Sequence, residues 1–305
     1  MSTTTLIASA APAKRRLRKP VADMPPRSIA PGPVARVFGI LALVVATLYF
    51  LVPVYWVFVA STKSNADLTR TFGFWFAEWN LGANYESLLK WTQGNFWTWV
   101  GNSILYSTTS GIIGTLFAIM AGYAIAKFAF PGKKLAVGII MAGLLLPVAI
   151  LTVPLYMEFH ALGLTNTMWS IIIPSSVSPF GVFLGMVYAE SSVPTELLEA
   201  ARIDGAGEGR IFFTIVLRLL APAMVTIFLF IFVATWNNFL LPLMMISSAE
   251  LKPVTLGLYG MMSYFAPEKG AVMLGALLGV IPLIILFFGL QRYWRSGLAA
   301  GAVKG

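Results

Sequence analysis

The stretch PTELLEAARIDGAG, from Pro194 to Gly207, is a polar insert between two long apolar segments. Proline suits the first turn of a helix, alanine favours the helix interior, and Gly205 stands where a left-handed residue would end it. Ser192 is the candidate N-cap. The pattern predicts a short helix, a glycine bend, and a second helix that leads into the next apolar segment through Ile211, Phe212, Ile215 and Val216.

The apolar segments around this insert indicate a membrane protein. The chain has 305 residues, of which 58% are hydrophobic and 11% charged, whereas soluble domains average about 25% charged residues. Six stretches without Asp, Glu, Lys or Arg are long enough to cross a bilayer, and lipid forces such stretches to be helical. They are residues 37–60, 102–126, 135–157, 169–189, 220–246 and 272–290. We therefore predict an all-α, polytopic membrane protein with six transmembrane helices.

The basic residues predict the orientation of these helices. With an even number of spans and both termini inside, most Lys and Arg residues fall on the cytoplasmic side, as the positive-inside rule requires. The insert then lies in a cytoplasmic loop at about 191–218. Residues 1–36 are expected to form a disordered basic tail, residues 37–296 the six-helix domain, and residues 297–305 a cytoplasmic C-terminal tail. The protein is expected in the cell membrane, with no role in nucleic-acid binding.

The residues argue against chemistry within this chain. There is no cysteine, and Gly132-Lys-Lys134 lacks the glycine and hydroxyl residue of a nucleotide-binding loop. His160 is the single histidine, which disfavours a metal site. We expect no catalytic, metal-binding or cofactor-binding residue. The six apolar stretches also lack the ionisable groups that ion-coupled carriers keep at mid-membrane.

Two segments leave alternatives open on physical grounds. The loop at 61–98 is rich in Phe and Trp, which fits an interfacial aromatic belt or a docking surface for an external partner. The polar insert fits a docking helix, because Ala200 and Ala201 allow close approach of another backbone. It equally fits an amphipathic helix lying on the bilayer surface.

The insert resembles the signature loop of ABC-importer permeases. Glu199-Ala200-Ala201, Gly205 and Ile215 follow the pattern of that loop, and Asp204-Gly205-Ala206 is similar to its sugar-importer version. The chain departs from the family at Arg218, where proline is common, with Pro222 a turn later. The resemblance implies a coupling helix that docks on a separate ATPase through Glu196, Glu199, Ala200, Ala201, Asp204, Gly205 and Ala206.

Further motifs resemble maltose-type permeases of bacterial sugar importers. They are Gly163-Leu-Thr-Asn-Thr167, Pro179-Phe-Gly-Val-Phe-Leu184, Trp236-Asn-Asn-Phe-Leu-Leu-Pro242 and the ending Gly297-Leu-Ala-Ala-Gly-Ala-Val-Lys-Gly305. The resemblance implies a tail that contacts the ATPase through Gly301, Val303 and Lys304. Adjacent amides in an apolar helix are costly unless paired, and amides beside an indole suit a neutral sugar. We therefore expect Trp236, Asn237 and Asn238 to line the translocation path or its gate.

The resemblance also implies the rest of the assembly. Such systems contain a second related permease, two ATPase subunits that bind ATP and magnesium, and an extracytoplasmic solute-binding protein. Two alternatives remain. The importer could take another solute such as glycerol phosphate, or the chain could be an ion-coupled secondary carrier.

Overall fold

The computed structural model describes residues 32–262 and 268–301, which form helices joined by loops and contain no strand. The chain divides into two compact units, Met1–Pro53 and Val54–Gly305, which are described separately. Most of the predicted basic tail, residues 1–31, lies outside the described residues.

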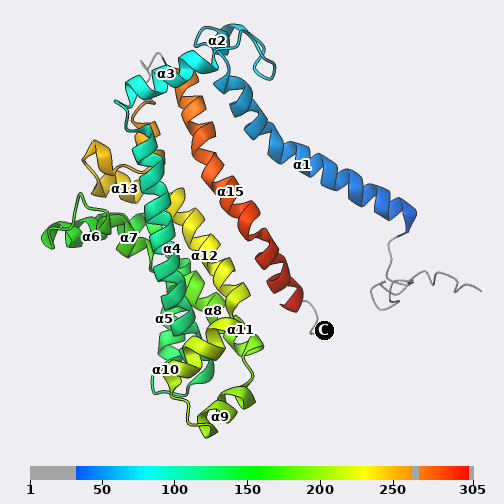
Figure 1. The fold of residues 1–305 in the computed structure, drawn as a ribbon, viewed down its shortest axis with the longest axis vertical. Helices are drawn as coiled ribbons and strands as arrows, with labels where there is room; N and C mark the ends of the chain where they lie inside the picture. Colours follow the sequence, from blue (N-terminus) through cyan, green and yellow to red (C-terminus); the bar gives the residue numbers. More distant parts are fainter. Residues whose placement is uncertain (1–31, 263–267, 302–305) are drawn as a thin grey trace, which may run out of the picture. The chain divides into compact units, whose positions relative to one another are not determined.

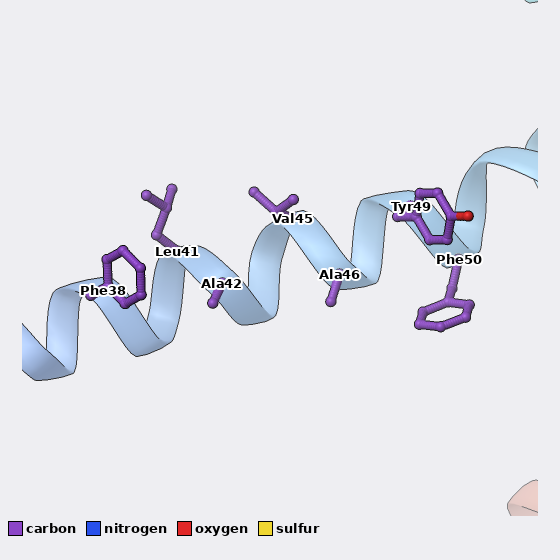
Figure 2. Close-up of a pocket in the computed structure, with 7 residues that line it drawn as sticks. All are labelled: Phe38, Leu41, Ala42, Val45, Ala46, Tyr49 and Phe50. Atoms are coloured by element: carbon purple, nitrogen blue, oxygen red, sulfur yellow. The ribbon is translucent and has the colours of Figure 1, made fainter.

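Helix α1, Pro33–Ser61, belongs to the first unit up to Pro53. It begins at Pro33, slightly before the apolar run predicted from Val37. Figure 2 shows one face of this helix, where apolar side chains recur every three or four residues: Phe38, Leu41, Ala42, Val45, Ala46, Tyr49 and Phe50. These side chains have the helical spacing and exposure of a surface that contacts lipid or another apolar helix.

Helix α4, Phe96–Lys127, is the central element of the second unit, and it packs mainly against α8, Pro179–Ser192, and α12, Ala221–Trp236 (Figure 1). Small residues let α4 and α8 approach closely. A Cβ atom added at Gly122 would lie 2.5 Å from the backbone carbon of Gly185, and one at Gly185 would lie 2.8 Å from the carbonyl oxygen of Ala118. Small residues spaced four apart allow this backbone contact in membrane helices.

The predicted third and fifth spans are bent or interrupted. Residues 135–157 form α5, Lys133–Leu145, and α6, Val148–Ala161, which meet at 105°. Residues 220–246 form α12 and a short α13, Leu240–Met245, so the helix stops at Trp236. Within the described residues, four helices are long and apolar enough to cross a membrane, and up to six spans result if each of two bent pairs counts as one.

Pro174 and Pro179 predict an interruption in the fourth span, residues 169–189, and the structure has one there. Helix α7, Trp169–Ser175, contains Pro174, and α8 starts at Pro179. Ser178 caps α8, because its Oγ accepts a hydrogen bond from the N–H of Gly181 at 3.0 Å. Together they form one apolar span of 24 residues.

The remaining helices lie at the two ends of α4 (Figure 1). At the Phe96 end lie α2, α3, η3 and α14, at Asp67–Arg70, Leu81–Trp91, Ala249–Leu251 and Val254–Tyr259. At the Lys127 end lie α9, α10, the π-helix η2 and α11, at Thr195–Ile203, Glu208–Ile211, Phe212–Val216 and Leu217–Leu219. Helix α15, Lys269–Gly301, packs along α12 and α3.

Polar side chains of α4 hold the segment 249–254 at the Phe96 end. The indole N–H of Trp99 donates to the Ala249 carbonyl at 2.7 Å, and the hydroxyl of Tyr106 donates to the Leu251 carbonyl at 3.0 Å. The Oγ of Ser103 accepts from the N–H of Val254 at 2.8 Å. These bonds pair helix with loop and give three polar side chains of the apolar run the partners that membrane burial favours.

Candidate functional site

The polar insert forms helix α9, which starts one residue after Pro194. The predicted N-cap at Ser192 is wrong, because Ser192 is the last residue of α8 and no side chain caps α9. The cause is Pro194, which disfavours helical geometry at the preceding Val193 and so separates the two helices there. Val193 is extended, with φ −112° and ψ 101°. Glu196 lies in the first turn, where a carboxylate interacts favourably with the helix dipole.

The C-terminal end of α9 confirms the predicted left-handed residue. Gly205 has φ +80°, a region that glycine enters without strain. Its N–H donates to the Arg202 carbonyl at 3.0 Å, and the N–H of Ala206 donates to the Ala201 carbonyl at 2.9 Å. This pair of bonds is a Schellman motif, which satisfies the last carbonyls of the helix and fixes the direction of the following chain.

One face of α9 is anchored to the body of the protein. Leu198 is buried in a cluster that includes Ile119 and Tyr123 of α4 and Ile211 of α10. Ala201 and Ala206 are half-buried and pack against the same cluster. These two predicted site residues therefore face inward. The other five are exposed and form one outward surface: Glu196, Glu199, Ala200, Asp204 and Gly205.

This surface also includes two apolar residues that were not predicted to belong to the site. Ile203 is 86% exposed at the end of α9, and Leu197 is also exposed. An isoleucine in a polar, exposed helix end signals an unpartnered contact, and this signal was present in the sequence. The surface therefore combines an acidic side, small residues and an apolar tip.

Arg202 connects α9 to its neighbours. Its Nε lies 2.6 Å from Oε1 of Glu208 and its Nη2 donates to Oε2 at 3.3 Å, a bidentate pair across the glycine bend. The guanidinium carbon also lies 5.9 Å from the ring centroid of Phe128, in the loop after α4. The hydrogen bond to Glu208 raises the pKa of Arg202 above its ordinary value. A planar, permanently charged guanidinium can make both contacts at once.

The second half of the insert turns sharply where it joins α12. The stretch Glu208–Leu219 and α12 meet at 80°, with the break at Leu220. Leu220 is buried, and Pro222 lies in the first turn of α12, where its missing N–H costs nothing. Arg218 stands just before the break, so the bend occurs without a proline at that position.

The predicted path residues lie at the break after α12. Trp236 is buried and stacks on Phe232 with ring centroids 5.7 Å apart, so its ring face packs inside the chain. Asn237 is exposed and its amide nitrogen donates to the Val233 carbonyl at 3.0 Å. The side-chain oxygen of Asn238 accepts from the N–H of Leu241 at 3.3 Å. The two amides thus lie between the end of one helix and the start of the next, with Asn237 exposed and Asn238 half-buried.

The other predicted features are placed as follows. Gly301 is the last residue of α15, while Val303 and Lys304 lie outside the described residues. His160 is exposed and stacks on Tyr156 with centroids 5.8 Å apart. Among the residues described, no group of three His, Asp or Glu side chains could hold a metal ion.

Asn166, from the quoted motif Gly163–Thr167, joins two loops. It has φ +56°, and its backbone N–H donates to the Met245 carbonyl at 2.8 Å. Its side-chain oxygen accepts from the N–H groups of Ser247 and Ser248 at 3.1 and 2.9 Å. The motif therefore fixes the segment after α13, which is a structural role.

Comparisons with known proteins agree with this arrangement. Residues 114–299 match the family model described as "Binding-protein-dependent transport system inner membrane component". The chain is 36% identical over 212 residues to the arabinooligosaccharides transport system permease protein AraQ of Halalkalibacterium halodurans, covering 70% of this chain and 76% of that protein. It is 30% identical over 270 residues to the lactose transport system permease protein LacG of Rhizobium radiobacter, covering 88% and 95%.

A solved structure has the same fold. It is a chain from a bacterial ABC transporter involved in the import of the acidic polysaccharide alginate, with a TM-score of 0.74 and 23% sequence identity. The match covers 87% of this chain and 99% of that one. The described helices therefore share the fold of that chain over most of their length.

Proposed function

The chain belongs to the family of inner membrane components of binding-protein-dependent transport systems, and we propose that it is the permease subunit of an ATP-driven importer for a neutral oligosaccharide. It is a multi-pass membrane protein with several apolar helices. The relatives named for arabinooligosaccharides and lactose support a sugar as the solute. The absence of Asp, Glu, Lys and Arg from the six apolar stretches favours an uncharged sugar over an acidic one.

The exposed surface of α9 is proposed to be the docking site for a separate ATPase subunit. The observation that carries this proposal is the combination of an anchored inner face and an unpartnered outer face on one short helix. Leu198 anchors α9 in the core cluster, and the Schellman motif fixes the direction of the chain that follows. A displacement of α9 should therefore move the helices that pack against it. The chain lacks a phosphate-binding loop, so ATP and magnesium are assigned to the partner.

The remaining features of the assembly are proposed on the same basis. The four clear spans and two bent pairs are counted as six crossings, with both termini and α9 in the cytoplasm. A second related permease completes the path, and an external solute-binding protein delivers the sugar. The tail at Gly301, Val303 and Lys304 is assigned to a second contact with the ATPase.

The coupling role is tested in the reconstituted transporter by measuring ATP hydrolysis and sugar uptake separately. Glu199→Lys changes an exposed side chain without touching the core, so the assembly should form while uptake per ATP falls. Gly205→Val should have the same effect, because a β-branched residue is strained at φ +80° and alters the end of α9. Gly209→Val is the matched control, since Gly209 is also exposed and open but has no positive φ. Unchanged uptake per ATP in both test variants rejects the proposal.

The substrate class is tested with labelled solutes in the same vesicles. Lactose or an arabinooligosaccharide should be taken up when ATP and the binding protein are present, and glycerol 3-phosphate should not compete. Competition by glycerol 3-phosphate would favour the importer of a phosphorylated solute. Uptake by this chain alone, driven by an ion gradient, would favour a secondary carrier.

The path role of the amides is a separate proposal. Asn237 is exposed at the break between α12 and α13, where a sugar hydroxyl could replace its bond to its own helix. Replacing Asn237 and Asn238 with leucine should reduce uptake while ATP hydrolysis continues. Asn237→Leu alone distinguishes sugar recognition from a structural effect, because in that variant the side-chain oxygen of Asn238 still accepts the N–H of Leu241.

A further inference from the structure

The segment between α1 and α3 presents large aromatic side chains to the surroundings. Phe72, Trp75 and Trp79 are 74%, 66% and 62% exposed, and Phe74 is also exposed. We call residues 72–79 the aromatic segment. Exposed aromatic residues in a short stretch are rare on surfaces that contact only water, so this segment has a partner.

The aromatic segment is held in one conformation by internal hydrogen bonds. Lys63 is 1% exposed, and its ammonium donates to the hydroxyl of Thr71 at 2.9 Å and to the Phe72 carbonyl at 2.7 Å. The N–H of Asn80 donates to the Thr62 carbonyl at 2.8 Å, which closes the loop at its base. A buried ammonium bonded to the loop backbone disfavours unfolding of the loop, because the charge would lose these partners.

The position of the segment along α1 gives its depth in the membrane. The hydroxyl of Tyr55 donates to the Phe74 carbonyl at 2.9 Å, and the rings of Phe58 and Phe76 have centroids 5.9 Å apart. The apolar run of α1 ends at Ala60. Tyr55 is six residues before Ser61, which places Phe74 about 9 Å back from the end of the helix. The segment therefore returns beside the last turns of an apolar, membrane-crossing helix.

We propose that the aromatic segment inserts into the headgroup region of the leaflet that surrounds the Ser61 end of α1, and anchors the permease there. The indole rings of Trp75 and Trp79 prefer this zone, because an indole combines an apolar body with a polar N–H, and the exposed phenyl rings add apolar area. A protein ligand such as the solute-binding protein would have to reach below the end of the helix to cover these rings. Lipid already occupies that depth.

The absence of cysteine from this chain allows a direct test. Trp75→Cys is made in the full transporter, with cysteine-free partner subunits, and labelled with a nitroxide. Trp75 contacts Phe76 by its edge and is otherwise exposed, so this change should leave the fold intact. Arg70→Cys is the matched control, because it is exposed on the same loop in α2. The accessibility of each label to oxygen and to a water-soluble nickel complex is measured in lipid vesicles.

The oxygen-to-nickel accessibility ratio should be several-fold higher at Trp75 than at Arg70, and it should not change when the solute-binding protein is added. A ratio at Trp75 equal to that at Arg70 overturns the proposal, because the segment then lies in water. Protection from both reagents also overturns it, since the segment is then covered by protein. Trp79→Cys gives an independent reading from the same face, and retained ATP-dependent uptake shows that each labelled variant is folded.

Discussion

The contact between α4 and α8 makes a quantitative prediction about Gly122→Ala. A Cβ atom at this position would lie 2.5 Å from the backbone carbon of Gly185 and 2.5 Å from the nitrogen of Met186. Carbon atoms in favourable contact lie about 3.5–4.0 Å apart, so the helices would have to separate by roughly 1 Å. The obstruction is backbone, which no side-chain rotation relieves.

Two opposing effects determine the size of the change. Overpacking a well-packed contact costs about 1–3 kcal/mol, and replacing glycine by alanine inside a helix gains about 1 kcal/mol. Gly101 provides a matched control in the same helix, because a Cβ atom there meets nothing within 4 Å. Gly101→Ala should show only the gain in helix propensity. The two variants should therefore differ by about 1–3 kcal/mol, since the helix-propensity term is common to both.

The measurement is the thermal unfolding midpoint of the purified transporter in detergent, followed by the loss of its monodisperse form. Gly101→Ala should raise the midpoint or leave it unchanged, and Gly122→Ala should lie several degrees below Gly101→Ala. Gly185→Ala should resemble Gly122→Ala, because its Cβ atom would lie 2.8 Å from the carbonyl oxygen of Ala118. Equal midpoints for Gly122→Ala and Gly101→Ala would refute the close backbone contact.

Three further outcomes are expected. Arg202→Gln should lower uptake per ATP hydrolysed, and the exchange of Arg202 and Glu208 should restore part of that uptake. Because the pKa of Arg202 is raised, the ion pair stays charged throughout the physiological pH range, and its stabilisation is lost only as the pH rises through that pKa. Uptake measured across the physiological range should therefore show no titration of this pair. Asn166→Ala should lower the unfolding midpoint, because it removes hydrogen bonds to Ser247 and Ser248 that contribute about 1 kcal/mol each. If Asn166→Gly restored the midpoint, the positive φ of this residue would matter more than those bonds. Gly257→Ala should reduce the yield of folded protein in a size-exclusion assay, because its Cβ atom would overlap the ring of Trp99, and a normal yield would contradict that packing.

The apolar runs and the glycine bend were predictable because each depends on local properties. A stretch of about 20 apolar residues has few alternatives to a helix in lipid, and residues 32–262 and 268–301 contain four such helices. Gly205 ends α9 because a left-handed residue is needed there and glycine adopts it freely. These predictions needed no knowledge of which elements become neighbours.

Apart from the break at Pro174 and Pro179, the helix breaks could not be predicted, because a proline only permits a bend. Leu146 precedes Pro147 and is extended, with φ −74° and ψ 124°, so α5 stops there. Pro154 and Pro282, in contrast, lie inside the continuous helices α6 and α15. Whether neighbours cover the freed carbonyl decides between these outcomes, and that depends on the packed structure.

The inward and outward faces of the site also depended on tertiary packing. The sequence treats Ala200 and Ala201 alike, yet the structure exposes one and packs the other against the cluster around Leu198. The burial of Trp236 had a signal in the sequence, since Phe232 precedes it by one helical turn and the two rings stack. An aromatic pair four residues apart favours packing over a free ring for a ligand.

The contacts around α9 determine which helices the proposed coupling movement reaches first. Leu198 packs in the same cluster as Ile119 of α4 and Ala189 of α8, and these two helices touch through backbone atoms at Gly122 and Gly185. A pair of helices joined by backbone contact resists sliding, because interlocked surfaces have discrete packings and do not deform continuously. Helix α12 belongs to the same cluster through Ala223, Ile227 and Ile231, and it joins the insert across an 80° break at Leu220. Force applied to α9 should therefore reach α4, α8 and α12 through this cluster, with the backbone contact keeping α4 and α8 together and the break at Leu220 acting as the hinge between the insert and α12. This expectation requires no charged residue inside the membrane.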